Sequence, residues 1–237
     1  MNAGKQTKGE RTKSLILETA MTLFQEKGYD ESTMRNIAER AGVALGNAYY
    51  YIPSKEHFIH AFYERLWNEQ LLAYEGVLEA ESTLKRRLLG VLVAELRIIE
   101  PHHRLCLALF KSAADPRSPV SPFSEESRPL RESCIDFYRR LVEGATETIP
   151  PELKRELPYL LWLFHMGVVL FWIYDRSFGS IRTQKLVLHS ADLIGNLVTL
   201  MSVPVMSPIR QRILNLIAAV KTEFLDETLP PLNPSQS

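Results

Sequence analysis

Residues 33–55 read TMRNIAERAGVALGNAYYYIPSK, and this stretch decides the fold. Ile37, Ala38 and Ala41 recur at the spacing that places small or apolar side chains on one face of a short helix. Gly42 follows at the point where a left-handed turn residue is needed to end that helix. The stretch therefore predicts a short helix that stops at a tight glycine turn.

A second short helix is expected over about residues 44–52, with Ala48 and Ile52 facing inward. Two short helices joined by a glycine turn form a helix-turn-helix, whose second helix is shaped to lie in the major groove of DNA. Pro53 and Ser54 then end this helix and begin the next one. The residues left facing outward, which form the expected DNA-reading surface, are Leu45, Gly46, Asn47, Tyr49 and Tyr50.

The composition excludes a strongly basic body. The chain has 237 residues, enough for one or two domains, and its 28 basic and 28 acidic residues cancel. Because no global positive field draws it onto nucleic acid, any DNA affinity must come from local charge. The first residues offer some such charge, and they also fit a solvated tail. Cys106 and Cys134 form no CxxC pattern and no secretory segment is seen at the N-terminus, so a reducing cytoplasm is expected.

The remaining segments also have the periodicity of helices, and no convincing strand pattern occurs. We expect an all-α protein of about nine helices, in which a three-helix head is followed by a larger helical domain. Thr33 caps the second helix of the head, although Asn36 at the third position leaves the capping box incomplete. The expected divisions are a disordered arm (1–9), the helix-turn-helix domain (10–55), a helical domain (56–227) and a disordered tail (228–237). After the helix-turn-helix, further helices of the chain are expected over about 54–74, 83–99, 101–110, 125–147, 157–174, 183–203 and 208–225.

Residues 157–174 read LPYLLWLFHMGVVLFWIY and contain no acidic residue, lysine or arginine. This length touches the range of a transmembrane helix, about 17 to 25 residues, so a helical membrane-associated protein is one alternative. A helix that is apolar on all sides can also be buried between its own domain and a partner subunit. We favour the second interpretation, because the neighbouring helices need a core. It predicts a homodimer formed through the helices of residues 157–203, with no membrane partner.

Residues 16–58, ILETAMTLFQEKGYDESTMRNIAERAGVALGNAYYYIPSKEHF, resemble the TetR/AcrR family of bacterial transcriptional regulators. The resemblance covers the first helix, the following turn, the helix-turn-helix and the tyrosine-rich end. Beyond it, only the number and length of the helices agree with that family. The resemblance implies an all-helical homodimer whose head binds a palindromic operator. It also implies that the domain over residues 56–227 binds a small-molecule effector and then releases the DNA.

The resemblance also suggests roles for residues of the head. Thr33 would meet a phosphate and Arg35 a guanine edge or a phosphate. In the second helix, Leu45 would touch a thymine methyl group, Gly46 would permit close backbone approach, and Asn47 would pair with adenine. Tyr49, Tyr50 and Lys55 would hold the DNA backbone, whereas Tyr51 is expected to pack. The chain departs from many relatives at Leu45 and Asn47, where small hydroxyl residues are common, so no known operator can be transferred to it.

The middle of the chain offers aromatic and polar residues that could line a small-molecule pocket. The same composition is found in any helical core. His103 and Cys106 share a helix face, but no second pair of possible ligands supports a metal site, and no cofactor is expected. The candidate pocket residues are His102, His103, Cys106, Phe110, Phe137, Tyr138, Trp162, His165 and Met166.

An enzyme is not expected, because the chain has no nucleophile elbow, phosphate-binding glycine loop, zinc-protease motif or paired catalytic carboxylates. The sequence therefore predicts a sequence-specific DNA-binding transcriptional regulator. Its expected partners are duplex operator DNA, a second copy of the chain and a small-molecule effector that releases the repressor. A repressor that works without an effector is the remaining alternative, because an empty core and a ligand pocket share one composition.

Overall fold

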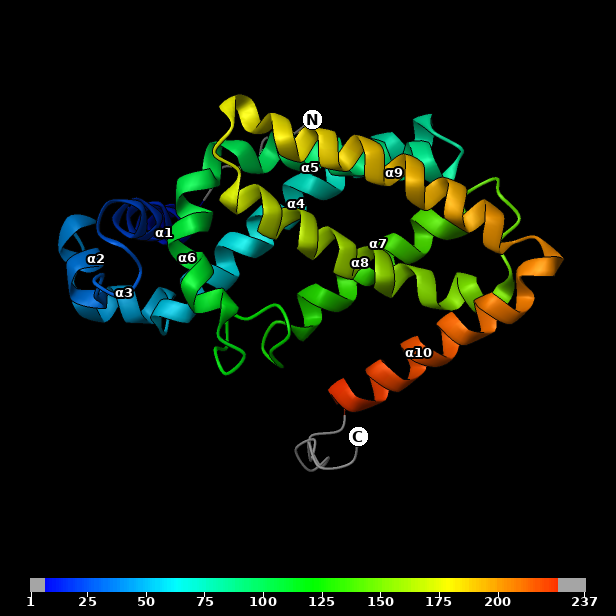
Figure 1. The fold of residues 1–237 in the computed structure, drawn as a ribbon. Helices are drawn as coiled ribbons and strands as arrows, with labels where there is room; N and C mark the ends of the chain where they lie inside the picture. The colour runs from blue at the N-terminus through cyan, green and yellow to red at the C-terminus, as the bar shows by residue number, and fades with distance from the viewer. Residues whose placement is uncertain (1–6, 226–237) are drawn as a thin grey trace.

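The computed structural model describes residues 7–225 of the chain and contains, within that range, ten α-helices and no β-strand (Figure 1). About nine helices were expected. Short 3₁₀ turns at Glu100–His102, Phe178–Ser180 and Pro204–Met206 join some of them. The helices are α1 Lys8–Lys27, α2 Met34–Arg40, α3 Leu45–Tyr51, α4 Lys55–Ala80, α5 Leu84–Ile99, α6 His103–Ala114, α7 Arg128–Glu143, α8 Pro151–Tyr174, α9 Ile181–Met201 and α10 Ser207–Leu225.

Helix α1 begins at Lys8, inside the expected disordered arm, because its first residues form a capping box. The Thr7 hydroxyl accepts from the Glu10 backbone N–H at 3.2 Å, and the Thr7 N–H donates to Glu10 Oε2 at 2.7 Å. Both bonds satisfy groups that would otherwise lack a partner at a helix start. The expectation of a disordered arm over residues 1–9 is therefore wrong for residues 7–9. Residues 1–6 and the expected tail over 228–237 lie outside the described residues.

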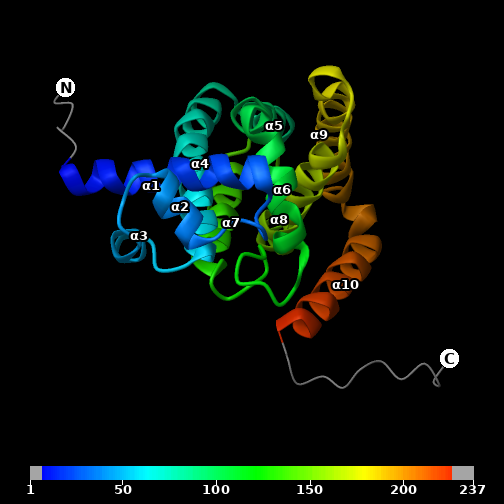
Figure 2. The same cartoon turned by 90° about the vertical axis from the view of Figure 1, so that its left-hand side faces the viewer.

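The head consists of α1, α2, α3 and the first half of α4, and it lies at one end of the molecule (Figures 1 and 2). Its core includes Ile16, Phe24, Ile37 and Ala48, all fully buried. Leu105 of α6 also belongs to this core. The head is therefore packed directly against a helix of the body as well as joined to it along the chain.

The body is a bundle of α4 to α9, with α5 against α9 and α7 against α8. Figure 1 shows α8 and α9 on one outer side of the bundle, and α10 running back beneath α8. Helix α4 serves both cores, since Phe58 and Phe62 pack in the head while Trp67 and Tyr74 pack in the body. The expected division at residue 55 thus falls at the start of a helix that both cores share.

Several helix bounds in the body differ from the expected ones: α4 continues to Ala80 instead of ending near residue 74, and α6 runs His103–Ala114 instead of 101–110. Helix α8 begins at Pro151, six residues before the apolar run, and continues through Pro158. Pro151 suits the first turn of a helix, and the PELKRE segment that it begins contains good helix formers. Helix α7 is shorter than expected, Arg128–Glu143, because the residues before it form successive turns and Gly144 ends it.

Candidate functional site

The turn between α2 and α3 has the geometry expected of a helix-turn-helix. Gly42 has φ +67°, in the left-handed region that residues with a Cβ rarely adopt. The Val43 N–H donates to the Ala38 carbonyl at 3.0 Å and the Ala41 N–H to the Ile37 carbonyl at 2.9 Å, which closes the end of α2. Ala48, fully buried, holds α3 against the head core. The turn thus fixes α3 with one face inward and one face outward.

The capping box at the start of α2 is complete, so the expectation that Asn36 would leave it incomplete is wrong. The Thr33 hydroxyl accepts from the Asn36 N–H at 3.2 Å, and Asn36 Oδ1 accepts from the Thr33 N–H at 3.3 Å. The Asn36 side chain is short, but its carbonyl oxygen reaches the same N–H that a glutamate would. Thr33 therefore has a structural role as the N-cap of α2, and it is exposed to solvent.

The outward face of α3 carries the side chains expected to read DNA. Tyr50 is 79% exposed, Tyr49 47% and Leu45 37%, and Asn47 is also exposed. No atom lies within 4 Å of the position a Cβ would take at Gly46, so another backbone can approach there. Helix α3 thus presents an open, uncharged surface directly after the turn that follows α2.

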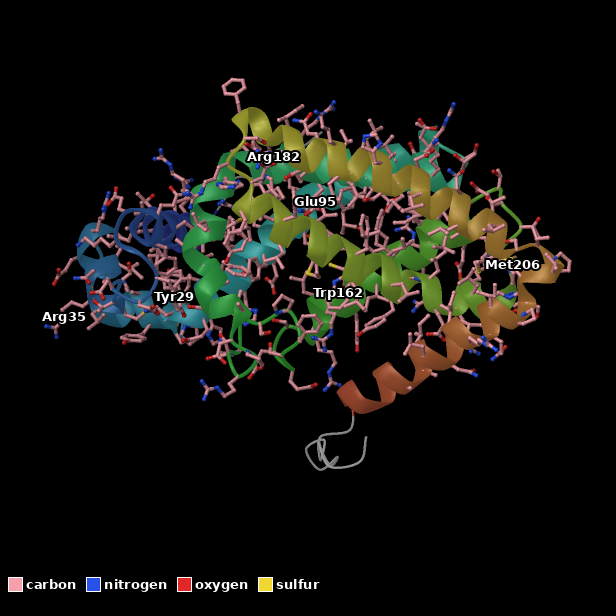
Figure 3. All side chains as sticks on the ribbon, viewed as in Figure 1. Tyr29, Arg35, Glu95, Trp162, Arg182 and Met206 are labelled. Carbon is pink, nitrogen blue, oxygen red and sulfur yellow. The ribbon has the colours of Figure 1, made fainter. Side chains whose placement is uncertain are left out.

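Arg35 adds a positive charge beside this face. It extends from α2 at the outer end of the head (Figure 3). It is exposed and forms no ion pair with any other residue in the range 7–225. An exposed guanidinium with no protein partner is available for a phosphate or a guanine edge.

Lys55, which is expected to hold the DNA backbone, already has partners within the protein. Its Nζ donates to the Tyr29 carbonyl at 2.7 Å and lies 4.1 Å from the centroid of the Tyr29 ring. The Tyr29 hydroxyl in turn donates to Glu56 Oε1 at 3.2 Å. Lys55 therefore ties the start of α4 to the turn before α2. A phosphate contact by Lys55 stays a prediction.

Sequence reasoning missed one contact that orients the helix-turn-helix. Arg40, at the end of α2, forms a bidentate ion pair with Glu26 of α1, in which Nη2 donates to Oε1 at 2.9 Å. Hydrogen bonding from Arg40 lowers the pKa of the Glu26 carboxyl. Fourteen residues separate the partners, so no local spacing rule indicates the pair.

The apolar helix α8 is buried on one face and exposed on the other. Its buried side includes His165 and Trp172, whereas Gly167 is exposed, Leu170 and Phe171 are each 43% exposed, and Tyr174 is 60% exposed. This spacing follows one face of the helix. On α9 the exposed apolar residues Leu193, Leu197 and Leu200 recur in the same way. Exposed apolar stripes on two neighbouring helices are typical of an interaction site.

By length and composition α8 could span a membrane, and the bent pair formed by residues 178–201 and 204–219 would pass the same test if counted as one span. Such helices are weak evidence, since core helices also meet the criterion. Helix α8 packs against α6, α7, α9 and α10. This packing favours the predicted buried helix of a globular domain.

The candidate pocket residues fall into two groups. Phe137, Tyr138, Trp162 and His165 lie in the body core, where the Tyr138 and His165 rings are 5.9 Å apart. Met166 packs at the edge of this core. The other four residues belong to α6 and the turn before it, where they contact the head or the end of α8: His102, His103, Cys106 and Phe110.

The core group surrounds a buried carboxylate that sequence reasoning missed. Glu95 of α5 (Figure 3) is 3% exposed, faces α4 and α8, and has its Oε1 2.9 Å from His165 Nε2. Its carboxylate also accepts from Gln70 Nε2 at 3.2 Å and from the Tyr74 hydroxyl. Burial acts to raise the pKa of Glu95, but His165, Tyr74 and Gln70 outweigh it and the pKa is lowered. The Tyr138 hydroxyl and His165 Nδ1 are buried without a hydrogen-bond partner in the described residues.

A hollow of about 500 Å³ lies elsewhere, between α5 and α9. None of the nine candidate pocket residues lines it. Its volume falls in the range of small-molecule sites. The lining residues are Leu89, Val93, Leu96, Arg97, Glu100, Gly179, Ser180, Ile181, Gln184, Lys185 and Leu188.

No group of three or more possible metal ligands occurs within the described part of the chain. His103 and Cys106, which share a face of α6, do not form such a group. Instead, His103 Nε2 lies 3.1 Å from the carbonyl oxygen of Trp172, and the two rings are 4.7 Å apart. His103 thus connects α6 to the end of α8.

Two family descriptions match the chain. Residues 16–62 match "Bacterial regulatory proteins, tetR family", and residues 87–211 match "Tetracyclin repressor-like, C-terminal domain". The first range contains the helix-turn-helix, and the second contains α6 to α9 completely, together with most of α5 and the start of α10.

Individual relatives agree with these matches. The HTH-type transcriptional repressor KstR2 of Mycobacterium tuberculosis is 24% identical over 173 residues, 72% of this chain and 84% of that protein. The HTH-type transcriptional repressor KstR of the same organism is 41% identical over 194 residues, 81% of this chain and 84% of that protein. A crystal structure of the transcriptional regulator FadR from Bacillus subtilis in complex with stearoyl-CoA has a TM-score of 0.59 at 18% identity. It covers 75% of this chain and 96% of that one, and it shows the same fold.

Proposed function

The chain belongs to the TetR family of bacterial regulatory proteins, and from this we propose how its head, body and apolar face act together. The protein is a non-enzymatic, DNA-binding transcriptional repressor that responds to a ligand. We propose that it acts as a homodimer, that it binds operator DNA through the 45–50 face of α3, and that a small molecule bound by the body releases the DNA. The cytoplasm, where operator DNA is found, is its proposed location.

The observation that carries the DNA-reading proposal is the exposed, uncharged face of α3. We propose that Asn47 pairs with an adenine and that Leu45 touches a thymine methyl group; both side chains are exposed, and the open space at Gly46 would allow close approach. Tyr50 of α3 and Arg35 of α2 would both contact the DNA backbone. Because the net charge of the chain is zero, these local contacts have to supply the affinity.

Thr33 and Tyr49 complete the proposed contact set. The hydroxyl and N–H of Thr33 are occupied by Asn36, so we propose that Thr33 contributes to the phosphate contact mainly by holding the N-terminus of α2 in place. Tyr49 is about half exposed and would contact the backbone beside Tyr50. Lys55 is bound to Tyr29, so its contribution to DNA binding would be to fix the turn before α2.

The dimer is proposed to form through the exposed apolar faces of α8 and α9. A two-fold interface uses the same surface on both copies, so α8 of one protomer would cross α8 or α9 of the other. No atom lies within 4 Å of the position a Cβ would take at Gly167, so the two helices could approach closely at the crossing. Such a dimer carries two heads, as required for two half-sites about 34 Å apart, one turn of DNA, or a multiple of that distance.

The effector proposal rests on family membership and on the body's own chemistry. Two buried polar atoms of the predicted pocket, the Tyr138 hydroxyl and His165 Nδ1, have no partner in the described residues, and buried polar groups normally have one. The predicted pocket residues His102, His103, Cys106, Phe110, Phe137, Trp162 and Met166 stay a prediction.

Selection of bound duplexes from a random pool, followed by binding measurements on variants, tests the DNA-reading proposal. Asn47→Ala should change the base preferred at one operator position, at a cost of about 1–3 kcal/mol for the preferred base. Tyr50→Ala should weaken binding to all sequences alike. Leu72→Ala, at an 81% exposed position on α4, is the control that should change neither the base preference nor the overall affinity for DNA. An Asn47→Ala variant with the parent's full base preference would show that α3 does not read the operator as proposed.

A screen for compounds that release the operator tests the effector proposal separately. Release by at least one small molecule, with a matching rise in thermal stability, would support it. An operator that no compound displaces would instead favour a repressor that works without an effector.

A further inference from the structure

The hollow between α5 and α9 combines an apolar floor with a positive charge on each rim. Leu89, Val93 and Leu96 follow one stripe of α5, and Ile181 and Leu188 face them from α9. Arg97 lies at the edge of the α5 stripe and Lys185 at the edge of the α9 stripe. Ligand sites are typically apolar with a few converging polar groups, and this hollow has that composition.

The two cations are available, whereas the acidic residue in the hollow is already engaged. Arg97 and Lys185 are exposed, and neither forms an ion pair with another residue of the described range. Glu100 accepts from Trp172 Nε1 at 2.8 Å and from the Ser180 hydroxyl at 2.9 Å. Arg97 lies about one turn from Glu100, and Lys185 about one turn from the start of α9, so an anion held by both cations would lie towards the Glu100 end of the hollow, where the Glu100 carboxylate is already hydrogen-bonded.

The Glu100 end of the hollow is closed by a strained turn. Gly179 has φ +59° and Ser180, a residue with a Cβ, has φ +53°. Asp175 holds this turn by accepting from the Ser177 and Thr183 backbone N–H groups at 2.9 and 2.8 Å. Strained backbone persists only where the surroundings determine it, and it is often found at ligand-binding positions. Here it fixes the wall against which a ligand would rest.

The position of the hollow would keep it open in the proposed dimer and places it near the helix that contacts the head. The hollow lies on the α5 side of α9, whereas Leu193, Leu197 and Leu200 lie on a different flank of that helix, so the proposed dimer would leave it open. Glu100 begins the 3₁₀ turn that joins α5 to α6, and Leu105 of α6 is part of the head core. A ligand in the hollow would therefore lie beside the turn that joins α5 to α6, the helix that packs against the head.

We propose that the hollow between α5 and α9 binds an amphipathic anion, an apolar chain or ring system that ends in one carboxylate or phosphate. The apolar part would cover floor residues such as Val93 and Leu188, and the anionic end would lie between Arg97 and Lys185. This inference rests on the proposed function in one respect only, namely that occupancy of the hollow would shift α6 and weaken operator binding.

Calorimetric titration with decanoate, below its micelle concentration, tests the site directly. Decyltrimethylammonium, which has the same chain and the opposite charge, is the matched probe. The variant Arg97→Glu/Lys185→Glu reverses both rim charges at exposed positions, and Arg182→Glu removes a nearby charge of α9 that does not line the hollow (Figure 3). The parent and R182E should bind decanoate alike. The double variant should bind it roughly tenfold more weakly or worse, since two charge contacts are lost and reversed.

A second variant tests the apolar floor. Leu188→Asp, at a 51% exposed position, should also abolish decanoate binding. Failure of the parent to bind decanoate, equal binding of decyltrimethylammonium, or unchanged decanoate affinity in the double variant would each overturn the proposal. Operator binding by the unliganded proteins is measured in parallel. Loss of operator binding in the parent would contradict the proposed function, while the calorimetric result would still report on the hollow.

Discussion

Replacing Glu95 with glutamine tests the buried polar cluster of the body. The change keeps the volume of the side chain and leaves one carbonyl oxygen to accept from the Tyr74 hydroxyl. It removes the negative charge that lies 2.9 Å from His165 Nε2. Gln70, whose Nε2 donates to Glu95 Oε1 at 3.2 Å, has to share the remaining acceptor. The variant thus removes the buried negative charge while most of the packing stays intact.

The expected loss in the free energy of unfolding is about 3 kcal/mol. Hydrogen bonds to a charged group contribute about 1.5–3 kcal/mol each, and E95Q removes the charge while its amide oxygen retains part of the hydrogen bonding, which gives a loss near the top of that range. For a chain of this size, each kcal/mol corresponds to about 2–4 °C in Tm, so a decrease of about 6–12 °C is expected. Glu79→Gln, at an exposed position of α4, is the control and should stay within about 0.5 kcal/mol of the parent.

The loss should also depend on pH in a defined direction. The pKa of Glu95 in the folded protein is below its ordinary value of 4.5. A lowered folded-state pKa means that the carboxylate stabilises the protein fully above about pH 4.5 and loses this effect as the pH falls through the folded-state pKa. The difference between the parent and E95Q should therefore be constant near neutral pH and shrink below about pH 4.5.

Urea unfolding at one fixed protein concentration, from about pH 7 to the lowest pH at which the parent is folded, measures both effects. A difference below about 0.5 kcal/mol near neutral pH would show that the cluster contributes nothing beyond its packing. A difference that grows on acidification would show that the sign of the Glu95 pKa shift is wrong.

Two further changes test the dimer face and the turn of the head. Gly167→Glu places a charge on the exposed face of α8, where no atom lies within 4 Å of the new Cβ, so the monomer should stay folded while the dimer dissociates in analytical ultracentrifugation. Leu72→Glu, exposed on α4, is its control; a G167E protein that stays dimeric would exclude this face. Gly42→Ala should destabilise the head by more than about 1 kcal/mol because φ is +67°, whereas Gly76→Ala within α4 should be neutral or stabilising. Amide hydrogen exchange in α2 and α3 measures the effect, and equal protection in the two alanine variants would contradict it.

The helix-turn-helix could be predicted from the sequence because its determinants are local. The small residues of α2, the left-handed Gly42 and the buried Ala48 lie within about a dozen positions of one another. The bond made by Lys55 was not predicted for the opposite reason, since its partner is the carbonyl of Tyr29, 26 residues earlier. A long-range bond to a backbone group leaves no pattern in the sequence.

The body was harder to predict, because both faces of α8 are apolar and its periodicity is therefore hidden. Only the fold shows that His165 faces inward while Gly167 and Leu170 face outward. Glu95 stands alone in the apolar stretch of α5, and its partners Tyr74 and His165 lie on α4 and α8, far from it along the chain. The hollow between α5 and α9 depends on the packing of two distant helices, so no single segment indicates it.

The central claim is that two copies of α3, held by the α8–α9 face, read one operator. Selection of bound duplexes from a random pool, combined with the mass of the resulting complex, tests it most directly. The expected result is an inverted repeat whose half-sites are one helical turn apart or a multiple of it, bound by an even number of protomers. A single asymmetric site bound by one protomer, or no enrichment of any sequence, would contradict it.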